Sequence, residues 1–127
     1  MESQAAGKPR ILIVDDEKHV REAFSEWFTL RGFATDLAAD GVEAVEKCAA
    51  NHYDVVTMDL QMPRMNGVDA ISILKRQRPE LPIVVVTGYL QQSEEAALQG
   101  AARVLTKPVS LRKIEEEVRH AMGAPAC

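Results

Sequence analysis

The chain has 127 residues and a mass of 14.0 kDa, the size of a single compact domain. Its formal net charge is −4, which gives no basic footprint for nucleic acid or for an anionic membrane surface. The longest apolar runs have the length of a strand and are too short to cross a bilayer. The two cysteines, Cys48 and Cys127, offer neither a disulfide framework nor a metal-ligand spacing. We expect a soluble cytoplasmic protein that binds neither nucleic acid nor membrane directly.

Short β-branched runs alternate along the chain with longer segments whose apolar residues recur every three or four positions. This alternation predicts a parallel sheet with helices on both of its faces. The strands are expected at residues 10–14, 33–37, 53–58, 82–86 and 102–106. The predicted helices are one that ends at Arg31-Gly32, one after Asp40-Gly41 with Asp40 as its N-cap, one from Asn66-Gly67 to before Arg78-Pro79, one at 91–99 and one from near Ser110.

The division of the chain follows from these elements. We expect a flexible N-terminal tail at 1–9 and one domain at 10–122. Residues 123–127 are either a C-terminal tail or the start of a linker, and the sequence leaves both open.

Polar side chains follow four of the five predicted strands. The first strand runs into Asp15 and Asp16, the third into Asp59, the fourth into Thr87 and the fifth into Lys107. The carboxyl ends of parallel strands meet at one edge of a sheet, and ligands bind at that edge. If the first and third strands are neighbours, the three carboxylates converge there.

Three carboxylates in one place repel one another unless a cation lies among them or a pKa rises. Hard oxygen ligands at an exposed edge suit Mg²⁺. A hydroxyl from Thr87 and an ammonium from Lys107 would complete a site for an anionic group, as phosphoryl transfer requires. Taken singly, each residue also has a structural interpretation. Asp15, Asp16 and Glu17 could cap the first helix, Asp59 could be a loop carboxylate, Thr87 a capping hydroxyl, and Lys107-Pro108 a turn.

Four stretches of the chain together resemble the receiver domain of two-component response regulators. They are ILIVDDE at 11–17, MDLQMPRMNG at 58–67, VTGY at 86–89 and LTKP at 105–108. The resemblance covers about Arg10 to Met122. It implies a flavodoxin-like (βα)5 fold, a doubly wound five-stranded parallel sheet in the order 2-1-3-4-5 with helices on both faces. It also implies a role in phosphorelay signalling, with a sensor histidine kinase or a histidine phosphotransfer protein as the phosphoryl donor.

The resemblance assigns roles around the metal. Asp59 would be the phosphoacceptor and would contact Mg²⁺. Asp16 would bind the ion directly, Asp15 largely through water, and the backbone carbonyl of Gln61 would complete the protein ligands. The domain would act as a phosphoacceptor, assisting its own phosphorylation and dephosphorylation but no other reaction.

It also assigns roles in switching. Lys107 would pair with the phosphoryl group, and its peptide bond to Pro108 would be cis, which X-Pro bonds tolerate. Phosphorylation adds charge and acceptor oxygens, so Thr87 would turn inward to donate a hydrogen bond. Gly88 would allow the backbone to approach the phosphoryl group closely. The face formed by the fourth helix, fifth strand and fifth helix would shift and control an output domain or effector, or a phosphorylation-dependent homodimer.

One position departs from the family pattern. Most receivers carry Tyr or Phe three residues before the lysine, and this chain has Val104. We expect the signal to pass through backbone displacement and through Tyr89, unless Val104 is simply core and other surfaces carry the output. Gln61 and Tyr89 occupy the positions that flank the path of attacking water in the family, so a bulky Tyr89 would slow hydrolysis; its alternative is a surface aromatic on a loop.

Three other functions remain open. One is an Mg²⁺-dependent phosphatase with an aspartate nucleophile, but such enzymes carry an acid–base Asp where this chain has Gln61, which transfers no protons. Another is a flavin-binding flavodoxin relative, whose phosphate the acidic turn after the first strand would repel. The third is a receiver-like interaction module that works without phosphorylation. The sequence does not show whether the chain acts alone or as part of a larger protein.

Overall fold

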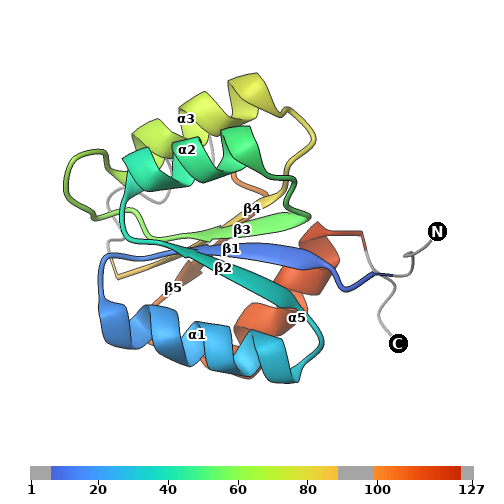
Figure 1. Cartoon of the computed structure of the whole chain (residues 1–127). Helices are drawn as coiled ribbons and strands as arrows, with labels where there is room; N and C mark the ends of the chain where they lie inside the picture. The colour runs from blue at the N-terminus through green and yellow to red at the C-terminus, as the bar shows by residue number, and fades with distance from the viewer. Residues whose placement is uncertain (1–6, 89–98, 124–127) are drawn as a thin grey trace.

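The computed structural model describes residues 7–88 and 99–123, and its elements alternate between strand and helix. In chain order they are β1 (Arg10–Val14), α1 (Lys18–Leu30), β2 (Ala34–Ala38), α2 (Gly41–Ala50), β3 (Val55–Met58), α3 (Gly67–Gln77), β4 (Ile83–Thr87), β5 (Arg103–Thr106) and α5 (Leu111–Ala121). The five strands form one parallel sheet in the order β2-β1-β3-β4-β5, which confirms the predicted topology (Figure 1). The helix expected at 91–99 lies, apart from its last residue, outside the described residues.

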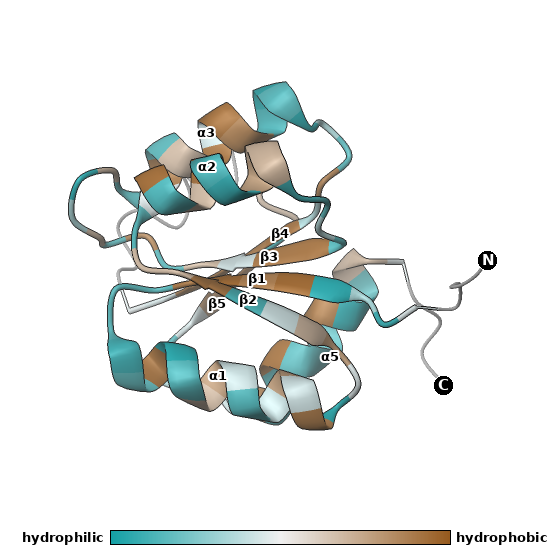
Figure 2. Cartoon of the chain, in the orientation of Figure 1, coloured by the Kyte–Doolittle hydropathy of each residue, from teal (hydrophilic) through white to brown (hydrophobic). Residues whose placement is uncertain are grey.

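The sheet separates two apolar layers, as the doubly wound fold requires. In β1, Leu12 and Val14 belong to the layer under α2 and α3, and Ile11 and Ile13 belong to the layer under α1 and α5. This alternation follows from the two-residue period of a strand. Figure 1 shows α2 and α3 on one side of the sheet and α1 and α5 on the other, and Figure 2 shows that the central strands are strongly apolar. Cys48 is buried in the layer under α2 and α3 as a free cysteine.

Side-chain caps begin three of the described helices. Asp40 accepts a hydrogen bond from the amide of Glu43 at 2.8 Å and caps α2 as predicted. Asn66 and Ser110 cap α3 and α5 in the same way. Each cap satisfies an amide that has no partner inside its helix. After α1, which ends where the sequence predicted, Gly32 has a φ of 95°, the left-handed conformation that often terminates a helix.

Hydrogen bonds continue the sheet beyond the ends of its strands and so fix the edge that carries the acidic residues. The amide of Asp59 donates to the carbonyl of Val14 at 3.0 Å, and the amide of Asp15 donates to the carbonyl of Ala38 at 3.1 Å. The carboxyl ends of β1 and β3 therefore lie side by side. Within the described parts of the chain, none of the helices has the length and apolar character needed to span a membrane.

A buried carboxylate joins α1 to α5. Glu115 accepts hydrogen bonds from Trp27 Nε1 at 3.0 Å, Arg31 Nε at 3.0 Å and Arg119 Nε at 2.9 Å, and its side chain is 8% exposed. Burial alone would raise the pKa of Glu115, but the hydrogen bond from Arg119, the charge of Arg31 and the hydrogen bond from Trp27 outweigh burial and lower it. The ionised form of Glu115 therefore stabilises the packing of these two helices.

We predict that Glu115→Gln lowers the free energy of unfolding at pH 7 by about 2 kcal/mol, because the charge-assisted hydrogen bonds between α1 and α5 are lost. The pKa of Glu115 is lower in the folded state than in the unfolded state. Its contribution is therefore complete above the unfolded pKa and is lost as the pH falls through the folded pKa. Urea unfolding of both proteins at neutral and at acidic pH should show a difference that is constant near neutrality and shrinks in acid.

Glu116→Gln is the matched control, because this neighbour on α5 is 56% exposed and lies 3.9 Å from Lys113. We expect its effect to stay within about 0.5 kcal/mol. An equal loss of stability in both variants, or a loss at Glu115 that does not depend on pH, would contradict the assignment.

Candidate phosphoacceptor site

Three carboxylates meet at the carboxyl ends of β1 and β3. Oxygen atoms of Asp15, Asp16 and Asp59 all lie within 4.8 Å of one another. Asp15 and Asp59 are buried, and Asp16 is exposed. The structure thus confirms the predicted convergence, with two acids buried and one open to solvent.

Lys107 supplies a positive charge beside the acids. Its Nζ lies 3.1 Å from Asp15 Oδ2 and 3.8 Å from Asp59 Oδ2. Burial opposes the charged form of Lys107, but the hydrogen bond to Asp15 and the charges of Asp15, Asp59 and Glu17 outweigh burial and raise its pKa. The lysine is therefore held as an ammonium.

The pKa of Asp59 is raised. Its burial is the largest cause and the negative charge of Asp15 the second, while Lys107 and the amides of Gln61 and Leu60 act in the opposite direction. The positive charge of Lys107 lowers the pKa of Asp59, but by less than burial and the charge of Asp15 raise it. The anionic form of Asp59 therefore gains from any further positive charge in the site.

The ends of β4 and β5 bring Thr87, Gly88 and Lys107 together. Thr87 is fully buried, and its carbonyl accepts a hydrogen bond from the amide of Lys107 at 2.8 Å. Gly88 is exposed, and a Cβ built on it would meet no atom within 4 Å, so the space beside it is open. An open cleft is lined by Asp16, Glu17, Asp59, Gln61, Gly88 and Lys107.

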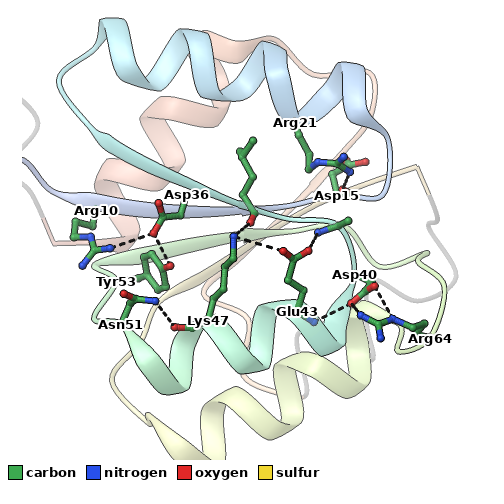
Figure 3. Close-up of polar contacts among 12 residues, drawn as sticks. Arg10, Asp15, Arg21, Asp36, Asp40, Glu43, Lys47, Asn51, Tyr53 and Arg64 are labelled. Atoms are coloured by element: carbon green, nitrogen blue, oxygen red, sulfur yellow. Dashed lines mark hydrogen bonds and ion pairs between the residues drawn. The ribbon is translucent and has the colours of Figure 1, made fainter.

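The acidic turn after β1 is held by contacts that the sequence did not reveal. Asp15 Oδ1 accepts a hydrogen bond from the amide of Glu17 at 2.9 Å, and Arg21 on α1 donates to the carbonyl of Asp15 at 2.7 Å (Figure 3). Glu17 occupies the N-cap position of α1, but its side chain makes no capping hydrogen bond. Glu17 therefore holds the cap position that the structural interpretation allowed but does not cap through its side chain, and it is one of the residues that line the cleft.

The loop that follows Asp59 packs closely against it. The amide of Gln61 lies 3.5 Å from Asp59 Oδ1, and the amide of Gly67 donates to the carbonyl of Leu60 at 2.8 Å. A Cβ on Gly67 would overlap the carbonyl oxygen of Asp59. Glycine is therefore required where α3 begins against the end of β3.

Of the three remaining residues singled out in the sequence, the structure describes Pro108 and Val104. The Lys107–Pro108 peptide bond is cis, as the resemblance implied. Val104 pairs in register with Val85 and packs, half-buried, against the layer under α2 and α3. Tyr89 lies outside the described residues.

Comparison with known proteins identifies the family. Residues 11–119 match the family model described as the response regulator receiver domain. The chain belongs to this family. The response regulator MprA from Mycobacterium sp. (strain KMS) is 38% identical over 112 residues, which are 87% of this chain and 49% of that protein. The chain thus spans about half the length of this curated relative.

Solved structures agree with the receiver fold. A CheY-like response regulator receiver domain protein from Methanospirillum hungatei JF-1 is 26% identical with a TM-score of 0.89, covering 92% of this chain and 95% of that one. The response regulator protein TrrA from Thermotoga maritima, solved in complex with Mg(2+)-BeF, is 27% identical with a TM-score of 0.83. That alignment covers 89% of this receiver domain and 98% of the TrrA chain.

We predict that Lys107→Met raises the pKa of Asp59 further in metal-free buffer, because the favourable charge is lost while burial and the charge of Asp15 remain. An NMR titration of ¹³C-labelled aspartate carboxyl groups in the presence of EDTA measures this shift. Lys113→Met is the control, since Lys113 pairs with Glu117 on α5. An unchanged titration of Asp59 in Lys107→Met would show that the ammonium does not act on it.

Proposed function

We propose that this receiver domain accepts a phosphoryl group on Asp59 with Mg²⁺ bound among the neighbouring acids, and that phosphorylation switches its surface to control an output. One observation carries the proposal: three carboxylates lie within 4.8 Å of one another beside one ammonium group. The donor set fits Mg²⁺, because carboxylate oxygens at a solvent-open cleft leave room for the waters that this ion retains.

Four residues would hold the metal, not all in the same way. Asp16 and Asp59 would hold the ion through their carboxylates, Asp15 largely through water, and Gln61 through its backbone carbonyl. When bound, Mg²⁺ supplies positive charge that neutralises the phosphoryl oxygens during transfer. The same charge would lower the pKa of Asp59 and keep it anionic.

Asp59 would act as the nucleophile. A carboxylate oxygen of Asp59 would attack the phosphorus of a phosphohistidine, so that a P–O bond forms and the P–N bond breaks. The ring nitrogen keeps the electron pair and takes up a proton from solvent, which leaves neutral imidazole on the donor. Lys107, whose Nζ lies 3.8 Å from Asp59, would then pair with the phosphoryl oxygens. The chemistry is limited to this transfer and to later hydrolysis of the acyl phosphate.

The switch would begin at the end of β4. The phosphoryl group adds charge and acceptor oxygens, and Thr87 would turn to donate a hydrogen bond to it beside Gly88. The shift would pass to the face of β5 and α5 through backbone displacement and Tyr89, since Val104 carries no ring. Two pre-existing conformations are then biased by the new contacts.

The partners follow from this chemistry. A sensor histidine kinase or a histidine phosphotransfer protein would donate the phosphoryl group. An output domain, an effector protein or a second copy of the phosphorylated chain would read the altered face.

We predict that incubation with acetyl phosphate and Mg²⁺ adds one phosphoryl group to the wild-type protein, and that Asp59→Asn abolishes the addition, because an amide cannot form the acyl phosphate. Intact-mass spectrometry followed by peptide mapping measures the product. Asp69→Asn, which changes an exposed acid near the start of α3, should be phosphorylated like the wild type. EDTA should prevent the reaction in all variants.

Three results would contradict the proposal. Phosphorylation that persists in Asp59→Asn would place the acceptor elsewhere. Repeated turnover of simple phosphomonoesters with Mg²⁺ would favour the phosphatase, and absence of any phosphorylation together with partner binding would favour the interaction module.

A further inference from the structure

The loop between β3 and α3 contains an arginine in an unusual conformation. Arg64 has a φ of 66°, the left-handed region that glycine adopts freely and that other residues enter only at a cost. A glycine at this position would avoid the cost. A side-chain contact that offsets it should therefore be present.

Arg64 makes such a contact with Asp40. Its Nε lies 2.8 Å from Asp40 Oδ2 and its terminal nitrogen lies 3.1 Å from Asp40 Oδ1, a two-pronged pair in which the planar guanidinium matches the carboxylate (Figure 3). Asp40 is also the N-cap of α2, and its side chain is 12% exposed. The pair thus connects the loop between β3 and α3 to the N-terminus of α2.

Backbone contacts support the same junction. The amide of Gly41 donates to the carbonyl of Met65 at 3.2 Å, and a Cβ on Gly41 would lie 2.6 Å from that oxygen. Met62 is buried in the core layer under α2 and α3. Gln61, the residue before Met62, is exposed and lines the same cleft as Asp59.

We infer that Arg64 is a positioning residue for the cation site, and that its ion pair with Asp40 holds the loop in the conformation that presents the Gln61 carbonyl to the metal. This inference rests on the proposed function, because it assumes that a cation binds among the acids. The ion pair of Arg64 is with Asp40 and not with Asp15, Asp16 or Asp59. Arg64 acts through the backbone of the four residues that lie between Asp59 and its own position.

The variants distinguish the effect of losing the Arg64–Asp40 ion pair from the effect of the strained backbone at residue 64. Arg64→Gly removes the ion pair and also relieves the strained φ, whereas Arg64→Ala removes the pair and keeps the strain. Asp40→Asn keeps the helix cap and removes the charge. Arg64→Lys keeps the charge but loses the two-pronged geometry.

Isothermal titration with MgCl₂ measures the affinity of each folded variant, with folding checked by circular dichroism. We expect the Kd for Mg²⁺ to rise about tenfold in Arg64→Gly, Arg64→Ala and Asp40→Asn, the range seen when residues supporting a metal's ligands are lost. Arg64→Lys should recover part of the affinity. The double variant Asp40→Asn with Arg64→Gly should bind no more weakly than either single variant, because both remove one interaction.

Arg10→Ala is the matched control. It removes a comparable ion pair, Arg10 with Asp36 at 3.1 Å with both side chains 40% exposed, at the other end of β1 (Figure 3). Its Mg²⁺ affinity should equal that of the wild type. A wild-type Kd in Arg64→Gly or Asp40→Asn overturns the inference and leaves the proposed function intact, whereas a wild-type protein that binds no Mg²⁺ overturns both.

Discussion

The fold places three carboxylates close together at one edge of the sheet, where their negative charges repel one another. Asp15 and Asp59 are buried side by side, with Asp16 beside them. Two like charges about 4 Å apart in a protein surface repel by on the order of 4 kcal/mol. Lys107 makes two attractive contacts, whereas three acids make three repulsive pairs. The raised pKa of Asp59 is the remaining imbalance, and the divalent cation proposed for this site would remove it.

The sheet imposes this repulsion through ordinary backbone geometry. Parallel strands β1 and β3 are neighbours, and the hydrogen bond from Asp59 to Val14 continues their ladder to the residue that carries the acid. The two apolar layers bury the strands, and Gly67 lets α3 begin against the carbonyl of Asp59. Core packing therefore stabilises an arrangement of charges that would not form by itself.

The sequence was sufficient for features that repeat or lie close along the chain. Alternating runs predicted every strand within two residues of its observed bounds, and Asp40 was recognised as a helix cap. The strand order and the cis bond before Pro108 came from resemblance to receivers, because no local pattern specifies either. The acids after two strands predicted the site once that order was assumed.

Long-range side-chain contacts were beyond such reasoning. Arg64 and Asp40 are 24 positions apart, and Glu115 and Trp27 are 88 positions apart. Each residue taken alone resembles ordinary charged or aromatic surface. Their pairing depends on which helix ends and loops the fold brings together, and that information is not local.

The location of a bound divalent ion tests the central claim most directly. Crystals grown with Mn²⁺, which shares the oxygen ligands of Mg²⁺, allow the ion to be located by its anomalous scattering. The account predicts one strong peak among the carboxylates of Asp15, Asp16 and Asp59. A fully loaded crystal with its peak elsewhere, or with none at this edge of the sheet, would contradict it.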